Sequence, residues 1–222
     1  MPSPVLQSLI GVNMAGLEAM RDHWWWRPGW RVGRSFFTWH VTFANQPAVA
    51  ELVDAYAPVL AQLPQLDPVP LRWLHLTTQG LGFTDEVDSG DVNRVVSAVQ
   101  KRCAELEPFT VTIGPARVER ETIQMPVRPA EPLARVRQAI RDAIGEVWGA
   151  DNVPEAADGF RAHVSLGYSN SAGPSEPVAE ALAEHGEHTA KVTVRAVSLI
   201  NLNRDNKAYE WENVATVRLG MP

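Results

Sequence analysis

The sequence predicts an α+β domain of two lobes, each an antiparallel-rich sheet with helices on the outside, around a central cleft. Segments with strand character and segments with helical apolar spacing follow each other irregularly, in the order strand-helix-strand-helix-strand-strand-helix-strand-helix-strand-strand. No glycine-rich phosphate loop and no simple repeating βαβ unit accompanies them. Two similar strand motifs, around His75 and His163, stand about half a domain apart. Their spacing suggests two similar halves related by a rough twofold.

Apolar spacing predicts the elements of the N-terminal half. Alternating polar and aromatic residues over 35–43 predict a strand. An apolar stripe from Val49 to Leu63 predicts a helix that Pro58 should kink. A proline-rich linker over 64–70 then leads into an apolar run over 71–82, which predicts the strand that carries His75.

The C-terminal half repeats this mixture of elements. An apolar stripe over 92–106 predicts a helix in which Cys103 is a buried core residue rather than a reactive thiol. The further predictions are strands at 109–118 and 122–127, a helix at 132–148, the strand of His163, a short helix at 178–185, and two closing strands at 191–203 and 208–219 joined by a hairpin turn.

Composition limits the class of protein. With 222 residues, 45% hydrophobic and 21% charged, the chain resembles an ordinary globular protein and not a disordered one. A net charge of -6 argues against binding of long DNA through counterion release and favours a small or short substrate. Cys103 is the single cysteine, so neither an internal disulfide nor a cysteine-based metal site can form. Lacking a signal-peptide pattern and a membrane-length apolar run, the chain is expected to be a cytoplasmic monomer.

Residues 1–34 are predicted to be an extension of a domain over 35–220, with a helix over 1–22 that its glycines weaken. The extension is rich in tryptophan and arginine, which could stack bases and hold phosphates. Alternatively, the indoles pack the extension against the domain with the arginines at the edge. Packing is favoured because no nucleic-acid motif is present. The residues concerned are Arg21, Trp24, Trp25, Trp26, Arg27, Trp30, Arg31 and Arg34.

His75 and His163 are the candidate catalytic residues, because each is followed two positions later by a hydroxyl. Side chains at i and i+2 of a strand share a face, so His75 should lie beside Thr77 and His163 beside Ser165. Arg161 falls on the His163 face by the same parity. We expect the two strands to bring both imidazole-hydroxyl pairs to one surface.

The pattern His-x-Ser/Thr is short and occurs three times in the chain. The third copy, at His40, lacks the glycine that follows the other two closely, so we expect His40 to be structural or to line the sheet near the cleft. For His75 and His163 the alternative is a pair of half-buried strand histidines whose hydrogen bonds are satisfied within the fold.

The segments 75–82 and 160–166 resemble the two signatures of the two-histidine (2H) phosphoesterases, which include the 2′-5′ RNA ligase-like proteins and cyclic nucleotide phosphodiesterases. The resemblance extends from about residue 35 to residue 220. Ala162 stands where such proteins often have proline, and the tryptophan-rich extension is not general among them. An added segment could reshape or cover the cleft, which leaves the substrate open.

The resemblance implies that His75 and His163 are the catalytic pair and that Thr77 and Ser165 bind phosphate oxygens. The chemistry agrees, because cleavage of a phosphodiester needs a base, an acid and hydrogen-bond donors, and two histidines titrating near neutrality supply the first two without metal or cofactor. Arg161 could add positive charge. The resemblance favours His163 as base and His75 as acid.

Substrate and direction of reaction are open at this level. A 2′,3′-cyclic nucleotide, an RNA end, a 2′-5′ linkage or a cyclic phosphate of a nucleotide-derived metabolite would all suit, for hydrolysis or for ligation. Trp73, Tyr209 and Trp211 could stack a base or pack in the core. The alternative function is a non-catalytic protein that binds nucleotides or RNA ends, against which the intact motifs argue. A metallohydrolase is weaker, because no His-x-x-x-His pair or acidic ligand cluster accompanies the histidines.

Overall fold

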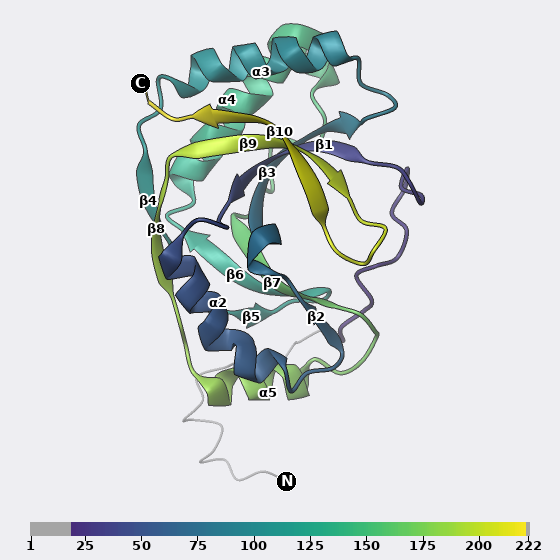
Figure 1. Cartoon of the computed structure of the whole chain (residues 1–222), viewed down its shortest axis with the longest axis vertical. Helices are drawn as coiled ribbons and strands as arrows, with labels where there is room; N and C mark the ends of the chain where they lie inside the picture. Colours follow the sequence, from purple (N-terminus) through teal and green to yellow (C-terminus); the bar gives the residue numbers. More distant parts are fainter. Residues whose placement is uncertain (1–18, 221–222) are drawn as a thin grey trace.

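The computed structural model describes residues 19–220, and the helix predicted over 1–22 falls on residues that lie almost entirely outside this range. The described chain contains ten strands, four α-helices and two 3-10 helices (Figure 1). In chain order these are β1 (Phe36–Thr42), α2 (Pro47–Leu60), β2 (Leu66–Pro68), η1 (Leu71–Trp73), β3 (His75–Phe83), α3 (Ser89–Cys103), β4 (Phe109–Ile113), β5 (Arg117–Val118), β6 (Thr122–Arg128), α4 (Glu131–Trp148), η2 (Ala150–Asn152), β7 (His163–Ser169), α5 (Glu176–His185), β8 (Ala190–Val194), β9 (Ala196–Asn203) and β10 (Glu210–Arg218).

The strands form two antiparallel sheets, and the predicted α+β class is confirmed at this level. One sheet has four strands in the order β10-β9-β1-β3. The other has the order β2-β7-β6-β4-β8, with β5 paired to β6 beside this path. Each of the two histidine strands, β3 and β7, therefore belongs to a different sheet.

Each sheet is covered by two of the helices (Figure 1). α3 and α4 pack on each other and contact β10 and β3 of the four-stranded sheet. α2 contacts β8 and α5 contacts β5, both in the other sheet. α2 follows β1 of the four-stranded sheet but packs on the other sheet, and α4 lies between β6 and β7 of the other sheet but packs on the four-stranded one. No helix within 19–220 is long and apolar enough to span a membrane.

The N-cap of α3 shows why this helix begins at Ser89. The Asp88 carboxylate accepts hydrogen bonds from the backbone nitrogens of Gly90 (2.8 Å) and Asp91 (3.2 Å), which satisfies two free donors of the first turn. Val95, Val99 and Cys103 then lie fully buried along one side of the helix. Cys103 is a core residue, and burial raises the pKa of its thiol to about 11.

Three predicted segments differ from the structure. The single strand predicted at 109–118 is divided into β4 and β5, with Gly114 and Pro115 between them. The single strand predicted at 191–203 is divided at Arg195 into β8 and β9, which belong to different sheets. No glycine or proline marks this division in the sequence, because the strand passes from one sheet to the other without a turn. The proline-rich linker contains the short strand β2, whose Leu66 is buried and whose backbone pairs with β7. The α2 helix ends at Leu60, two residues after Pro58.

Candidate active site

His75 and His163 begin their strands and line one cleft of about 620 Å³, together with Thr77 and Ser165. The strand β3 contributes the first pair and β7 the second, so the cleft lies where the two sheets meet. Tyr209, which precedes β10, also lines it. The structure therefore brings together both imidazoles, both hydroxyls and one of the three aromatic residues predicted from the sequence.

The two imidazoles are held in the same way. Nδ1 of His75 lies 2.7 Å from the carbonyl oxygen of Trp73, and Nδ1 of His163 lies 2.8 Å from that of Arg161. A carbonyl oxygen can only accept a hydrogen bond, so Nδ1 carries the proton in each neutral ring. Nε2 is then the nitrogen left to exchange a proton with a substrate.

His40 supports the first pair from within the sheet. Its ring is 1% exposed and stacks on that of His75 at a centroid distance of 4.2 Å, with 4° between the ring planes. Nε2 of His40 is 3.1 Å from the hydroxyl of Thr77 and fixes its orientation. Burial, with the neighbouring His75, holds the pKa of His40 well below 6.5, so this imidazole is neutral at neutral pH. His40 also borders the cleft.

His75 is neutral too in the unliganded protein. The pKa of His75 is lowered to about 4, mainly by burial. The Trp73 carbonyl opposes this shift, and the proximity of His163 adds to it. The Trp211 ring packs edge-on against His75 at 5.3 Å and contributes to this burial. A neutral imidazole with a free Nε2 is a proton acceptor.

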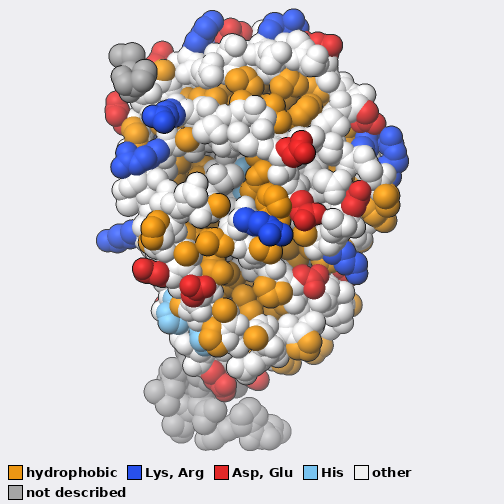
Figure 2. All heavy atoms as spheres, in the orientation of Figure 1, with side chains coloured by type: hydrophobic (Ala, Val, Ile, Leu, Met, Phe, Trp, Pro, Cys, Tyr) orange, Lys and Arg blue, Asp and Glu red, His pale blue; other side chains and the backbone are white. Residues whose placement is uncertain are grey.

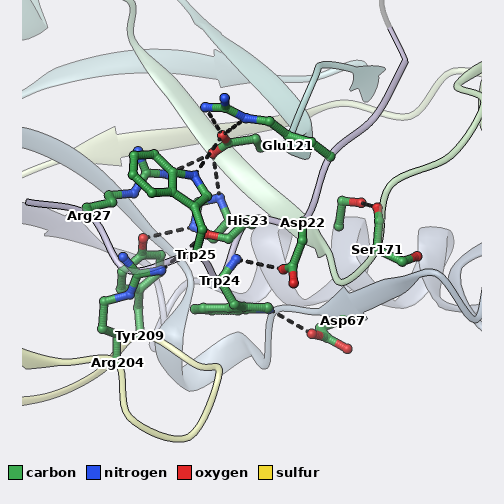
Figure 3. Close-up of polar contacts among 12 residues, drawn as sticks. Asp22, His23, Trp24, Trp25, Arg27, Asp67, Glu121, Ser171, Arg204 and Tyr209 are labelled. Carbon is green, nitrogen blue, oxygen red and sulfur yellow. Dashed lines mark hydrogen bonds and ion pairs between the residues drawn. The ribbon is translucent and has the colours of Figure 1, made fainter. Parts of the chain in front are cut away.

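Ser165 belongs to a polar chain that reaches the N-terminal segment. Ser165 is buried close to the phenol of Tyr168, whose ring stacks on His23 at 4.2 Å. Nε2 of His23 lies 2.8 Å from the hydroxyl of Tyr209, and Nδ1 lies 3.2 Å from the Glu121 carboxylate (Figure 3). Burial raises the pKa of Tyr168, so its phenol stays neutral and remains able to donate.

Three residues predicted for the site do not line the cleft. Arg161 is exposed, and its carbonyl rather than its guanidinium meets His163. Trp73 and Trp211 pack against each other at 4.8 Å behind the His75 ring. Trp73 and Arg161 were placed by strand parity, but β3 begins at His75 and β7 at His163, so both residues precede their strands.

The N-terminal segment contributes cleft residues that no motif predicted. Arg21, His23, Arg27 and Trp30 all line the cleft. Burial, followed by the nearby Arg27, lowers the pKa of His23 to about 4, while Glu121 opposes the shift. The abundance of arginine and tryptophan was the signal for this segment, but composition carries no information about which side chains turn inward. Within residues 19–220, no group of three or more His, Cys, Asp or Glu side chains could hold a metal ion.

Similarity to solved structures agrees with this architecture. The fold is similar to that of TT0787 from Thermus thermophilus, with 20% sequence identity and a TM-score of 0.62 over 85% of this chain and 98% of that one. It is also similar to apo LigT from E. coli, at 14% identity and a TM-score of 0.61 over 85% and 99% of the two chains. The MHV ns2 PDE domain is more distant, at 9% identity and a TM-score of 0.52 over 77% and 99%. LigT has also been solved complexed with 3′-AMP and with ATP.

Sequence comparison identifies the family. No curated protein sequence matches the chain. A family sequence pattern described as the 2′-5′ RNA ligase superfamily matches residues 61–206, well over half of the chain and including both histidine strands. This chain belongs to the 2′-5′ RNA ligase superfamily of 2H phosphoesterases.

Proposed function

We propose that this protein is a metal-independent phosphodiesterase that cleaves a 2′,3′-cyclic nucleotide, an RNA end or a related cyclic phosphate. The observation that carries the proposal is the shared cleft of His75 and His163, in which each Nδ1 is tied to a backbone carbonyl and each Nε2 is left free. Thr77 and Ser165 place a hydroxyl beside each imidazole. Membership of a phosphoesterase superfamily supports the same activity.

In hydrolysis, one imidazole removes a proton from the attacking water while the other protonates the oxygen that leaves phosphorus. Hydroxyl donors from Thr77 and Ser165 offset the charge on the phosphoryl oxygens. The low pKa of His75 favours this residue as the base and His163 as the acid, which is the reverse of the assignment that the resemblance suggested. To reset the site, the base releases its extra proton to solvent and the acid takes up a proton from solvent; no metal enters this scheme.

Several observations support a nucleotide or a short RNA end as substrate. A cleft of about 620 Å³ falls within the range of small-ligand sites. The relative LigT has been solved complexed with 3′-AMP and with ATP. On the face shown in Figure 2, acidic and hydrophobic side chains separate the Lys and Arg side chains of the described chain. A long duplex would find no continuous basic surface there.

We also infer that the two halves are related by an approximate twofold. The segments β1 to β3 and β6 to β7 each run from a strand through a long helix to a strand that begins with a cleft histidine, with β2 and η1 inserted in the first and η2 in the second. In each segment the helix packs on the opposite sheet. An approximate twofold would put the two catalytic candidates on facing walls of the cleft that both of them line.

The test is hydrolysis of 2′,3′-cyclic nucleotides and of oligonucleotides with a cyclic end, in EDTA. His75→Ala and His163→Ala should each lower kcat/KM by on the order of 10²-fold or more, and Thr77→Ala should cost less. His185→Ala is the matched control, because His185 hydrogen-bonds to the Ala55 carbonyl and neither residue lines the cleft. Binding without turnover would favour the non-catalytic alternative.

A nitrophenyl phosphodiester separates the roles of the two histidines, because its leaving group needs no proton. The proposed acid then becomes dispensable, so His163→Ala should recover much of its lost rate while His75→Ala should not. Recovery in His75→Ala alone would mean that the acid and the base are the other way round.

A further inference from the structure

The tryptophans near the start of the described chain fall into two groups. Trp24 is 8% exposed, and its Nε1 donates to a carboxylate oxygen of Asp67 at 2.8 Å. Trp25 and Trp26 are 40% and 48% exposed. Packing against the domain accounts for Trp24, but it leaves two neighbouring indoles in contact with solvent. An exposed indole has a cost that a binding role would explain.

Trp25 lies at the rim of the cleft beside Arg27 and Glu121, both of which line it (Figure 3). The guanidinium carbons of Arg21 and Arg27 are 5.4 Å and 5.1 Å from its ring centroid. Its Nε1 is 3.2 Å from a carboxylate oxygen of Glu121, which also lines the cleft. Trp26 differs, because its ring lies 5.9 Å from the guanidinium carbon of Arg204, which does not line the cleft.

Around Trp25, the two guanidiniums are more exposed than the carboxylate that pairs with them. Glu121 pairs with both Arg21 and Arg27, so one carboxylate offsets two guanidiniums. The carboxylate side chain is 14% exposed, whereas the arginine side chains are 44% and 35% exposed. The positive groups therefore face solvent, with the negative group beneath them. His23 adds no positive charge at neutral pH, because burial lowers its pKa to about 4.

We propose that Trp25, Arg21 and Arg27 form a binding site for the nucleotide next to the reacting phosphate in a single-stranded oligonucleotide. The base stacks on the exposed indole in place of a guanidinium that now packs against the ring, and the guanidiniums turn to meet the linking phosphate, as in proteins that bind single strands by stacking and charge. The site rests on the proposed function, which puts the reacting phosphate at His75 and His163. The preferred substrate is then an oligonucleotide end rather than a free mononucleotide.

The test measures equilibrium binding of a 3′-phosphorylated mononucleotide and a 3′-phosphorylated tetranucleotide by fluorescence. The tetranucleotide should bind wild-type protein at least about tenfold more tightly. Trp25→Ala should lower the ratio of the two Kd values about tenfold. Trp26→Ala is the matched control, since it removes an equally exposed indole from the adjacent position, and it should leave the ratio unchanged.

Arg27→Gln provides a second variant that tests charge. It should lower the slope of log Kd for the tetranucleotide against log salt by about one, without a matching change for the mononucleotide. The proposal is overturned if the ratio of Kd values is one in the wild type, if it survives in Trp25→Ala, or if Trp26→Ala lowers it equally. Cleavage assays test the phosphodiesterase activity separately. If the tetranucleotide binds more tightly but no cyclic phosphate is cleaved, the phosphodiesterase is rejected. If cyclic phosphates are cleaved but the two Kd values are equal, the Trp25 site is rejected.

Discussion

The two cleft histidines have similar motifs but different surroundings. His75 is covered by the stacked His40 ring at 4.2 Å and by the Trp211 edge at 5.3 Å, and both contacts keep water from its charged form. His163 takes part in neither of these two ring contacts. Neighbouring side chains that come from other strands, rather than the motif itself, therefore distinguish the proposed base from the proposed acid.

The pH dependence of kcat/KM should reflect this burial. His75 must be neutral to accept a proton, so activity falls when the pH drops through its pKa. With that pKa lowered to about 4, the acidic limb of the profile should lie well below the ordinary histidine value of 6.5. The measurement is kcat/KM for a 2′,3′-cyclic nucleotide across the pH range in which the protein stays folded by circular dichroism.

Trp211→Ala supplies the control for this explanation. Loss of the indole hydrates the His75 ring, so the acidic limb should move toward 6.5 while the rate on the alkaline side changes less. A wild-type limb near 6.5 would contradict the role of His75 as a buried neutral base. If the acidic limb of the pH profile did not shift in Trp211→Ala, the Trp211 ring would not be a cause of the low pKa of His75.

Strand parity predicted the parts of the site that lie within strands and failed outside them. It placed Thr77 beside His75 and Ser165 beside His163, and all four residues line the cleft. It failed for Trp73, which belongs to a 3-10 turn, because side chains do not alternate faces there. The stacking of His40 on His75 depends on the register of β1 against β3, which a single sequence does not encode locally.

At the scale of elements, the N-terminal segment is tied to the domain at several points. The backbone of Met20 pairs with that of Gly173, and the nitrogen of His23 donates to the Ser169 carbonyl at 2.8 Å. The Trp24 ring packs on Tyr168 at 5.2 Å and on Tyr209 at 5.5 Å. These contacts join the segment to β7 and to the start of β10.

Trp24→Ala should lower the free energy of unfolding by about 3 kcal/mol or more, because it removes a buried indole and one of the two side-chain donors to the Asp67 carboxylate, the other being Asn170. Trp26→Ala should change it by no more than about 0.5 kcal/mol, since this ring is half exposed. Urea unfolding of both variants gives the comparison. Equal losses in the two variants would show that exposure does not rank these tryptophans, and that the segment is held mainly by its backbone contacts.

Elements with a clear period were predicted to within a few residues, and elements without one were missed. The helices α3 and α4 follow continuous apolar stripes, which define one buried side. β2 has only three residues, Leu66–Pro68, and lies in a proline-rich stretch. It is therefore too short for an alternation of polar and apolar residues to be recognised. β8 and β9 read as one strand because the division at Arg195 changes the partner strands and not the residue type. Sheet membership is decided by tertiary pairing.

At the scale of the whole molecule, the exchanged helices join the two sheets. α2 lies between β1 and β3 in the chain but packs against β8, and α4 lies between β6 and β7 but packs against β3. If the two sheets moved apart, α2 or α4 would lose the sheet that covers its apolar side. Separation of the sheets would therefore expose apolar surface. The buried apolar residues accordingly form one continuous cluster that includes Trp39 of β1 and Ile123 of β6.

We therefore expect the two sheets to unfold as one cooperative unit. Hydrogen exchange in low urea should give opening free energies that agree within about 1 kcal/mol for peptides of β9 and of β6, the interior strands of their sheets. Cys103 offers an independent probe, because its buried thiol, whose pKa burial raises to about 11, should react with a thiol reagent only through the same opening. Separate opening free energies for the two strands would mean that the lobes unfold independently, and that contacts of α2 and α4 across the sheets contribute little to stability.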